Sequence, residues 1–252
     1  MYLRCHSSLI IAWHIALTSD MIYLIIHDSG KSTHQNANSL SVVQRIEGIT
    51  MAKELYTIGY AGFPNTQDFL NTLKNNGVQI LIDVRSSPFS AYYAAYNKDV
   101  LSNLLKENGI YYFNFARQFG ARQESIDFYK NGRLDFETFS RSEQFLDGMH
   151  KVDDSNAVVA FMCAEKKPSE CHRTILVAKA FSDKGQEVTH IMPDGESMTQ
   201  HDVEQELLEA YFPDRAQASM FEEENKSEEE YIVEAYRRRN DEIGFKWEDL
   251  RK

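Results

Sequence analysis

The sequence predicts an α/β fold: a mostly parallel sheet with helices on both faces, followed by a helical acidic C-terminal tail. Two observations carry this prediction. Between about residues 53 and 195, short apolar runs of strand length alternate with segments whose apolar residues recur at helical spacing. Glycines end several of the helix-like segments, and a new apolar run follows each of them. Strands that are joined through helices run parallel and are covered on both faces.

The predicted strands and helices alternate in chain order. Strands are expected at 54–60, 78–84, 110–114, 157–162 and 187–192, and helices at 65–77, 98–109, 135–151 and 171–181. Because the carboxyl ends of parallel strands meet at one edge of a sheet, the polar and aromatic residues that end these strands are predicted to lie together. They are Tyr60, Asp83, Arg85 and Cys163.

Composition and charge narrow the class of protein. With 42% apolar residues in 252, the chain can bury a substantial core. The net charge of −11 comes mainly from residues 196–252, where 17 acidic and 8 basic residues give −9. The near-neutral core therefore does not favour bulk nucleic-acid binding, although a local basic patch stays open. Three cysteines at no disulfide-framework spacing fit a reducing cytoplasm, and the protein is expected to be cytoplasmic.

The chain is predicted to have three parts: residues 1–50, an α/β domain at 51–195, and an acidic helical or flexible tail at 196–252. The apolar runs within residues 1–50 are interrupted by His14, Asp20 and His27, so neither is long enough to span a membrane. Residues 1–50 are expected to be a non-native or disordered upstream extension, with Met51 as the natural start. A poorly formed export signal is the alternative.

The segment 163–173 carries the densest group of chemically reactive side chains in the sequence. It follows the strand at 157–162 and leads into a helix. In one interpretation it binds an anion or a phosphate, because a helix amino terminus offers free N–H groups and arginine recognises phosphate in a planar, bidentate manner. Arg85, His172 and Arg173 are the predicted charge partners. Asp83 would orient Arg85 or His172, or act as a general base. The alternative is that Asp83 and Arg85 simply pair at a strand end.

A second interpretation is thiol chemistry. A cysteine between a strand and a helix, here Cys163, is the arrangement of enzymes in which a loop wraps an anion and lowers the thiol pKa. Cys171 is a second candidate because it begins the helix, and Glu165 is a candidate for proton transfer. However, the spacing C-x5-R is absent, and Glu165 fits an anion cradle poorly. Buried structural cysteines are the alternative.

No metal site and no cofactor are predicted. Cys163, Cys171 and His172 are metal-ligand types, but seven residues separate the two cysteines, unlike the short knuckle of structural zinc sites. The side chains of the adjacent Cys171 and His172 are expected to point in different directions.

Two further segments suggest partners. The aromatic loop 88–96 would stack on a base or a nucleotide, or would fold back as a lid over the core. In the tail, the segment 217–221 (QASMF) resembles the pentapeptide by which polymerases and repair proteins dock on the bacterial sliding clamp. Gln217, Met220 and Phe221 are the expected contacts. The alternative is that Met220 and Phe221 pack back on the domain.

Six short blocks occur in one order along the chain: Thr57-Ile-Gly-Tyr60, Asp83-Val-Arg85, Tyr96-Asn97, Gly120-Ala-Arg122, Cys163-Ala-Glu165 and Cys171-His-Arg173. Together they resemble the bacterial domain-of-unknown-function 488 family over about residues 53–195. Phe119 and Ala121 stand where the family often has leucine and glycine. The resemblance implies an α/β fold and a shared pocket, to which Tyr60 and Arg122 would add ligand contacts, but it implies no reaction.

The sequence thus predicts a cytoplasmic protein of DNA maintenance, with an anion-binding pocket around 163–173 and a clamp-docking peptide at 217–221. Nucleic acid, a nucleotide or the clamp would be its partners, and no membrane is expected. The alternatives are a stand-alone enzyme of thiol or phosphate chemistry on a small molecule, and a binding module without catalysis.

Overall fold

The computed structural model describes residues 14–18, 21–25, 54–215 and 226–251. The chain divides into two compact units, residues 1–50 and 51–252. In the first unit, strands β1 (His14–Thr18) and β2 (Met21–Ile25) pair antiparallel. The origin of residues 1–50 as an upstream extension stays a prediction.

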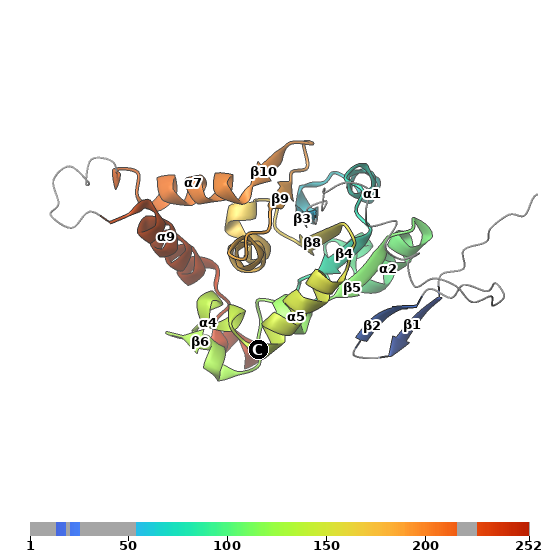
Figure 1. The fold of residues 1–252 in the computed structure, drawn as a ribbon, viewed down its shortest axis with the longest axis horizontal. Coiled ribbons are helices and arrows are strands. Elements are labelled where there is room, and N and C mark those ends of the chain that lie inside the picture. Colours follow the sequence, from blue (N-terminus) through green and yellow to red (C-terminus); the bar gives the residue numbers. More distant parts are fainter. Residues whose placement is uncertain (1–13, 19–20, 26–53, 216–225, 252) are drawn as a thin grey trace, which may run out of the picture. The chain divides into compact units, whose positions relative to one another are not determined.

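In the described part of the second unit, six strands form one sheet in the order β10-β9-β3-β8-β4-β5 (Figure 1). They are β3 (Leu55–Gly59), β4 (Ile80–Asp83), β5 (Tyr111–Asn114), β8 (Val159–Cys163), β9 (Val188–Ile191) and β10 (Ser197–Thr199). All neighbours are parallel except β10, which pairs antiparallel with β9 at one edge. The predicted α/β fold with a mostly parallel sheet is confirmed, and β10 is a strand that was not predicted.

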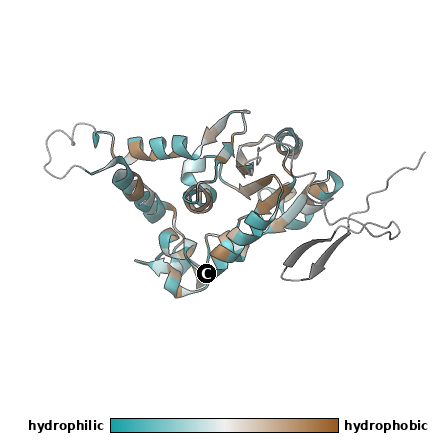
Figure 2. Ribbon diagram, viewed as in Figure 1, coloured by the Kyte–Doolittle hydropathy of each residue, from teal (hydrophilic) through white to brown (hydrophobic). Residues whose placement is uncertain are grey.

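Helices cover both faces of the sheet. One face packs on α1 (Thr66–Asn75) and α2 (Lys98–Glu107), and the other on α5 (Glu143–Asp154) and on a helix made of η5 (Arg173–Ala178, a π-helical stretch) and α6 (Lys179–Ser182). Strand β8 contributes side chains to the core on both faces of the sheet. Its first, third and fifth residues lie in one core cluster, and its second and fourth lie in the other. Figure 2 shows apolar residues concentrated on the central strands.

The remaining elements are short connections and the C-terminal helices. They are η1 (Tyr60–Gly62), η2 (Ala94–Tyr96), α3 (Ala116–Phe119), η3 (Ile126–Phe128), β6 (Tyr129–Lys130), β7 (Arg133–Leu134), α4 (Phe136–Ser140), η4 (Pro168–Glu170), α7 (Gln200–Tyr211), α9 (Glu228–Ile243) and η6 (Trp247–Arg251). The single helix predicted at 135–151 is wrong. It is two helices, because Ser142 adopts an extended backbone and its side chain accepts a hydrogen bond from the Phe145 N–H, which starts α5 afresh.

The C-terminal helices pack on the sheet domain. Helices α7 and α9 lie side by side (Figure 1), and the rings of Phe212 and Tyr231 are 4.9 Å apart. Asn240 of α9 accepts a hydrogen bond from the Phe136 N–H at 2.8 Å and donates one to the Leu134 carbonyl at 2.8 Å. The tail is helical, as predicted, and these contacts anchor it to the domain. No helix in the described ranges is long and apolar enough to cross a membrane.

A buried polar chain joins the sheet to these helices. Thr57 of β3 lies 2.8 Å from Nδ1 of His190, and Nε2 of His190 lies 3.0 Å from the Gln200 amide oxygen. The Gln200 amide in turn donates to the Tyr236 hydroxyl at 2.6 Å. Burial lowers the pKa of His190 to about 3. The imidazole is therefore neutral at pH 7. Through Gln200 and Tyr236 it connects the sheet to helices α7 and α9.

Candidate functional site

The residues predicted at the strand ends do reach one edge of the sheet, but they form two groups. Gly59 pairs with Cys163 in register, and Asp83 with Met162. Because side chains alternate along a strand, Val84 faces the core cluster that contains Cys163, whereas Asp83 before it faces the other side. Asp83 and Cys163 therefore lie on opposite faces of the sheet.

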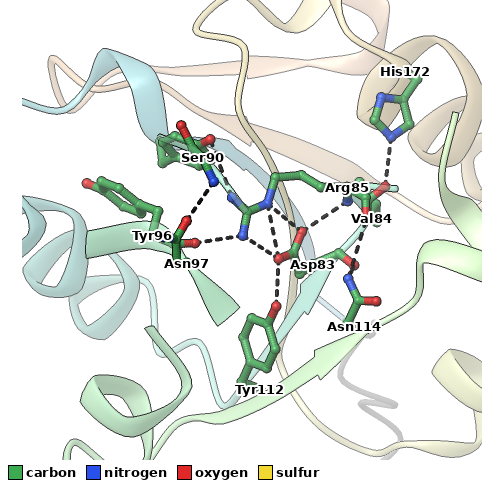
Figure 3. Close-up of polar contacts among 10 residues, drawn as sticks. Asp83, Val84, Arg85, Ser90, Tyr96, Asn97, Tyr112, Asn114 and His172 are labelled. Atoms are coloured by element: carbon green, nitrogen blue, oxygen red, sulfur yellow. Dashed lines mark hydrogen bonds and ion pairs between the residues drawn. The ribbon is translucent and has the colours of Figure 1, made fainter. Parts of the chain in front are cut away.

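The first group is centred on Asp83 and Arg85 (Figure 3). Two guanidinium nitrogens of Arg85 donate to the Asp83 carboxylate, Nε to Oδ1 at 2.9 Å and Nη2 to Oδ2 at 2.6 Å. The Tyr112 hydroxyl donates to the same carboxylate at 2.6 Å, and Arg85 Nη2 also donates to the Tyr96 carbonyl at 2.8 Å. Burial alone would lower the pKa of Arg85, but hydrogen bonds and charge from Asp83 raise it. The simple pairing of the two residues at a strand end is what the structure shows.

The aromatic loop above this group is partly a lid and partly exposed. Tyr96 is buried and stacks on Tyr60 with ring centroids 4.3 Å apart, and Tyr93 meets Tyr60 edge-on at 5.4 Å. Tyr92 and Phe89, by contrast, are 94% and 69% exposed. The loop thus covers Tyr60 and leaves two rings in solvent.

The second group brings together two thiols, a carboxylate and an imidazole. Cys163 ends β8, and Cys171 and His172 precede η5, with Glu165 on the loop between them. The Cys163 and Cys171 sulfurs lie 2.8 and 2.9 Å from the same carboxylate oxygen of Glu165. They lie 3.7 and 4.0 Å from Nδ1 of His172. One ligand-type atom from each residue falls within 4.8 Å of the others.

The orientation of the His172 ring is set by the backbone of β4. Its Nε2 lies 2.9 Å from the Val84 carbonyl oxygen, which can only accept, so Nε2 carries the proton (Figure 3). In the neutral ring the lone pair is then on Nδ1, which faces both thiols. Figure 3 shows the His172 ring and the Arg85 guanidinium on different sides of the β4 end.

The expectation that the side chains of Cys171 and His172 diverge is wrong. The backbone changes from extended at Cys171 (φ −133°, ψ 139°) to helical at His172 (φ −61°, ψ −24°). This bend brings the two consecutive side chains to the same side, with Sγ 4.0 Å from Nδ1. The argument from sequence against a metal site therefore loses its main support.

The four groups perturb one another's protonation. Burial raises the pKa of the Cys163 thiol, and the negative charges of Cys171 and Glu165 raise it further. Burial also acts upward at Cys171, but hydrogen bonding with Cys163 and the charges of Arg173 and His172 outweigh it, so the Cys171 pKa is lowered. Burial and Cys171 raise the pKa of Glu165. Burial alone would lower the pKa of His172, yet Cys171 and Glu165 raise it. Three acidic groups thus lie close together in one buried site, where the ionisation of one disfavours the ionisation of the others.

The backbone of the loop between Cys163 and Cys171 is held by Arg173 and by residues at the end of β3. Arg173 is fully buried, and its guanidinium donates to the carbonyls of Glu165 at 2.6 Å and Lys166 at 3.2 Å. Among the described residues no ion pair includes Arg173. The Ala61 N–H donates to the Ala164 carbonyl at 3.0 Å, and Gly59 lies directly against the Glu165 carbonyl. Arg173, predicted to contact a ligand, holds the loop in this structure.

The other predicted residues lie elsewhere. The Arg122 guanidinium lies 4.7 Å from the centre of the Phe245 ring. Gln217, Met220 and Phe221 fall outside the described residues. Sequence reasoning missed Tyr112, which binds Asp83, and the Val84 carbonyl, which orients His172. Nothing in the sequence marks a backbone carbonyl as a partner, whereas a tyrosine one strand away from Asp83 could have been found from the parallel order of β4 and β5.

Three comparisons with known proteins gave one match. Neither curated proteins nor solved structures yield a match to the chain. The model of the family described as "Domain of unknown function DUF488" matches residues 65–180, which include β4, β8 and all four residues of the thiol, carboxylate and imidazole cluster. The resemblance noted in the sequence is thereby confirmed over residues 65–180, which match the DUF488 family model.

Proposed function

We propose that the DUF488 domain binds one divalent transition-metal ion of the zinc type through Cys163, Glu165, Cys171 and His172. The observation that carries this proposal is the convergence of one ligand atom from each of these residues. Two thiolates, an imidazole and a carboxylate are a donor set that zinc accepts, with sulfur and nitrogen favouring it over magnesium or calcium. We name the four residues the metal centre.

The sulfur–nitrogen distances are close to those of a tetrahedral site. Metal–sulfur bonds of about 2.3 Å and metal–nitrogen bonds of about 2.0 Å place the ligand atoms roughly 3.5 to 3.8 Å apart. The two sulfurs lie 3.7 and 4.0 Å from Nδ1 of His172. The thiols are hydrogen-bonded to the carboxylate at sulfur–oxygen distances of 2.8 and 2.9 Å, which are shorter than this spacing. A metal would replace these shared protons, and the carboxylate would move outward by less than 1 Å, roughly, to reach tetrahedral spacing.

The surroundings of His172 are those of a metal ligand. A metal-bound histidine generally donates its second ring N–H to a carbonyl or carboxylate, which fixes its tautomer. The Val84 carbonyl accepts this bond at 2.9 Å. A cation would also stabilise the ionised forms of these acidic groups, since burial and then the neighbouring acidic groups raise the pKa of Cys163 and that of Glu165.

The metal centre is a stronger candidate than the anion pocket. Arg85 is bound to Asp83, and the Arg173 guanidinium is bound to two carbonyls of its own loop. An incoming phosphate would have to break these contacts. The nucleophilic role of a free thiol is also less favoured, because Cys163 and Cys171 are only 2% and 1% exposed.

Cobalt binding to the full-length chain tests the metal centre. We expect one metal ion per chain by elemental analysis, and a cobalt(II) derivative with thiolate-to-metal charge-transfer absorption and the strong visible bands of a tetrahedral site. Cys163→Ser and Cys171→Ser should each weaken metal binding by about 100-fold or more. Cys5→Ser, which lies outside the described residues, is the matched control and should bind as the parent does. Absence of thiolate absorption in the parent chain would exclude the proposal.

A second candidate function is docking on the bacterial sliding clamp through Gln217, Met220 and Phe221, in keeping with a role in DNA maintenance. The observation that favours it is the place of the peptide in the chain. The residues on its two sides are held: Arg215 bonds back to Glu209 at 2.9 Å, and Ser227 caps the start of α9. A docking peptide between two anchored helix ends would tether the whole domain.

Binding of the full chain to purified clamp tests this function. We expect micromolar affinity, and a loss of at least about tenfold in Gln217→Ala/Phe221→Ala. Glu223→Ala/Glu224→Ala, a matched pair just after the peptide, should bind almost as the parent does. Equal binding of the parent and the Gln217/Phe221 variant would remove the link to the clamp. Neither result depends on the metal centre.

A further inference from the structure

The four residues of the metal centre are not held equally. Cys163 is the last residue of β8 and pairs with Gly59 in the sheet. The Cys171 carbonyl accepts bonds from the N–H groups of Thr174 and Ile175 at 3.0 Å each, which ties it to the start of η5. His172 is fixed through the Val84 carbonyl. Three of the four side chains are therefore positioned by regular structure or by a backbone contact outside the centre.

The Glu165 side chain has no such support. In the described part of the chain, its carboxylate forms hydrogen bonds only with the two thiols of the centre. Glu165 as a whole residue is exposed to solvent, whereas both cysteines are buried. Of the four residues, Glu165 is therefore the one through which the centre reaches the surface.

The backbone of Glu165, by contrast, is rigidly held. Its carbonyl accepts from Arg173 at 2.6 Å and packs on Gly59, and the neighbouring Ala164 carbonyl accepts from the Ala61 N–H at 3.0 Å. The carboxylate can thus turn out into solvent by side-chain rotation alone, without moving the loop or the other three ligands.

From these contacts we infer that Glu165 is an exchangeable ligand, and that a small coordinating anion or water takes its place on the metal. This inference rests on the proposed metal centre and gives it a ligand class: small anions that coordinate a metal, of which a carboxylate and azide are examples. The exchange breaks one metal–oxygen bond and forms another, and no electron or proton has to leave the site.

The arrangement has a chemical consequence. Three fixed protein ligands and one open position are the pattern of catalytic zinc, whereas four fixed ligands are the pattern of structural zinc. A metal with an open position polarises a bound carbonyl, or lowers the pKa of a bound water so that hydroxide forms near neutral pH. The centre is therefore a Lewis-acid site, with Cys163, Cys171 and His172 as its permanent ligands.

Azide binding to the cobalt(II) form of the full chain tests the inference, with azide as a small coordinating anion. In the parent chain azide should shift the visible cobalt bands. In Glu165→Ala the metal should stay bound, and the half-saturating azide concentration should fall by at least about tenfold, because the tethered carboxylate no longer competes at its high effective concentration. Glu170→Ala is the matched control: an exposed glutamate of the same loop, paired with Lys167 at 3.1 Å. It should respond to azide as the parent does.

The outcomes separate the two proposals. If the parent chain shows no thiolate–cobalt absorption, the metal centre itself fails. If the parent binds cobalt but Glu165→Ala loses it as fully as Cys171→Ser does, Glu165 is a permanent ligand and the site is closed. Cobalt bands that ignore azide in both the parent and Glu165→Ala would likewise overturn the open position, while leaving the metal centre in place.

Discussion

Gly59→Ala is expected to destabilise the domain by about 3 kcal/mol and to weaken metal binding together with stability. A Cβ at this position would overlap the carbonyl oxygen of Glu165 and come within 2.9 Å of its carbonyl carbon. The clash is with backbone, so no side-chain rotation relieves it. Either β3 or the 163–172 loop must shift, and a shift of the loop moves Glu165 away from the two thiols. Chemical denaturation and cobalt titration of the same variant measure both effects.

Gly185→Ala is the matched control for this variant. Gly185 has φ +80°, and a Cβ there would meet no atom within 4 Å. Its substitution should cost about 1 kcal/mol from backbone strain alone and leave the cobalt spectrum unchanged. If Gly59→Ala were no more destabilising than Gly185→Ala and bound cobalt normally, the close approach of the loop to β3 would be contradicted.

Arg173→Met is expected to have an effect of similar size, a loss of about 3 kcal/mol in the free energy of unfolding. The change keeps an apolar stem in the buried space but removes the donors to the Glu165 and Lys166 carbonyls. Unpaired carbonyls in a buried site are costly, and the loop that carries Glu165 would lose its anchor. Metal affinity should fall by about 10- to 100-fold, as for other contacts that orient a metal ligand from outside the centre.

Arg141→Met is the control for the loss of a guanidinium. Arg141 is 75% exposed and pairs with Glu137 on the surface of the molecule at 2.8 Å. Exposed ion pairs contribute little, so this variant should stay within about 0.5 kcal/mol of the parent. Arg173→Lys serves as a second test of the site, because one ammonium cannot match the planar fork that reaches two carbonyls. Full stability and full metal binding in both Arg173 variants would show that the guanidinium does not hold the loop.

The structure assigns a physical task to each of three sequence blocks of the DUF488 domain. In Cys163-Ala-Glu165, the outer residues lie at the proposed metal centre and the middle carbonyl accepts a hydrogen bond from the Ala61 N–H. In Cys171-His-Arg173, the first two residues lie at the centre and the third holds the loop. In Asp83-Val-Arg85, the outer residues pair with each other and the Val84 carbonyl orients His172. In Asp83-Val-Arg85 the spacing reflects the alternation of side chains at the end of a strand, whereas in Cys171-His-Arg173 the bend between Cys171 and His172 sets it.

The sequence by itself determined the fold class, because alternation of apolar strands with amphipathic helices depends only on local periodicity. It also located the chemistry: parallel strands place Asp83, Cys163 and Tyr60 at one edge, and the structure puts them there. These conclusions needed no knowledge of which side chains touch, since strand ends in such a sheet share an edge whatever follows them.

Only the tertiary structure decided what this chemistry is. Seven residues lie between Cys163 and Cys171, and the distance between their side chains depends on the path of the loop, which Arg173 sets through backbone carbonyls. Whether Cys171 and His172 converge depends on one change of backbone angle between them. The separation of Asp83 from Cys163 follows from the pleat of β4 and β8. Contacts made through carbonyl groups and through a single φ, ψ change leave no residue-type signal, and for that physical reason they became visible only in the folded chain.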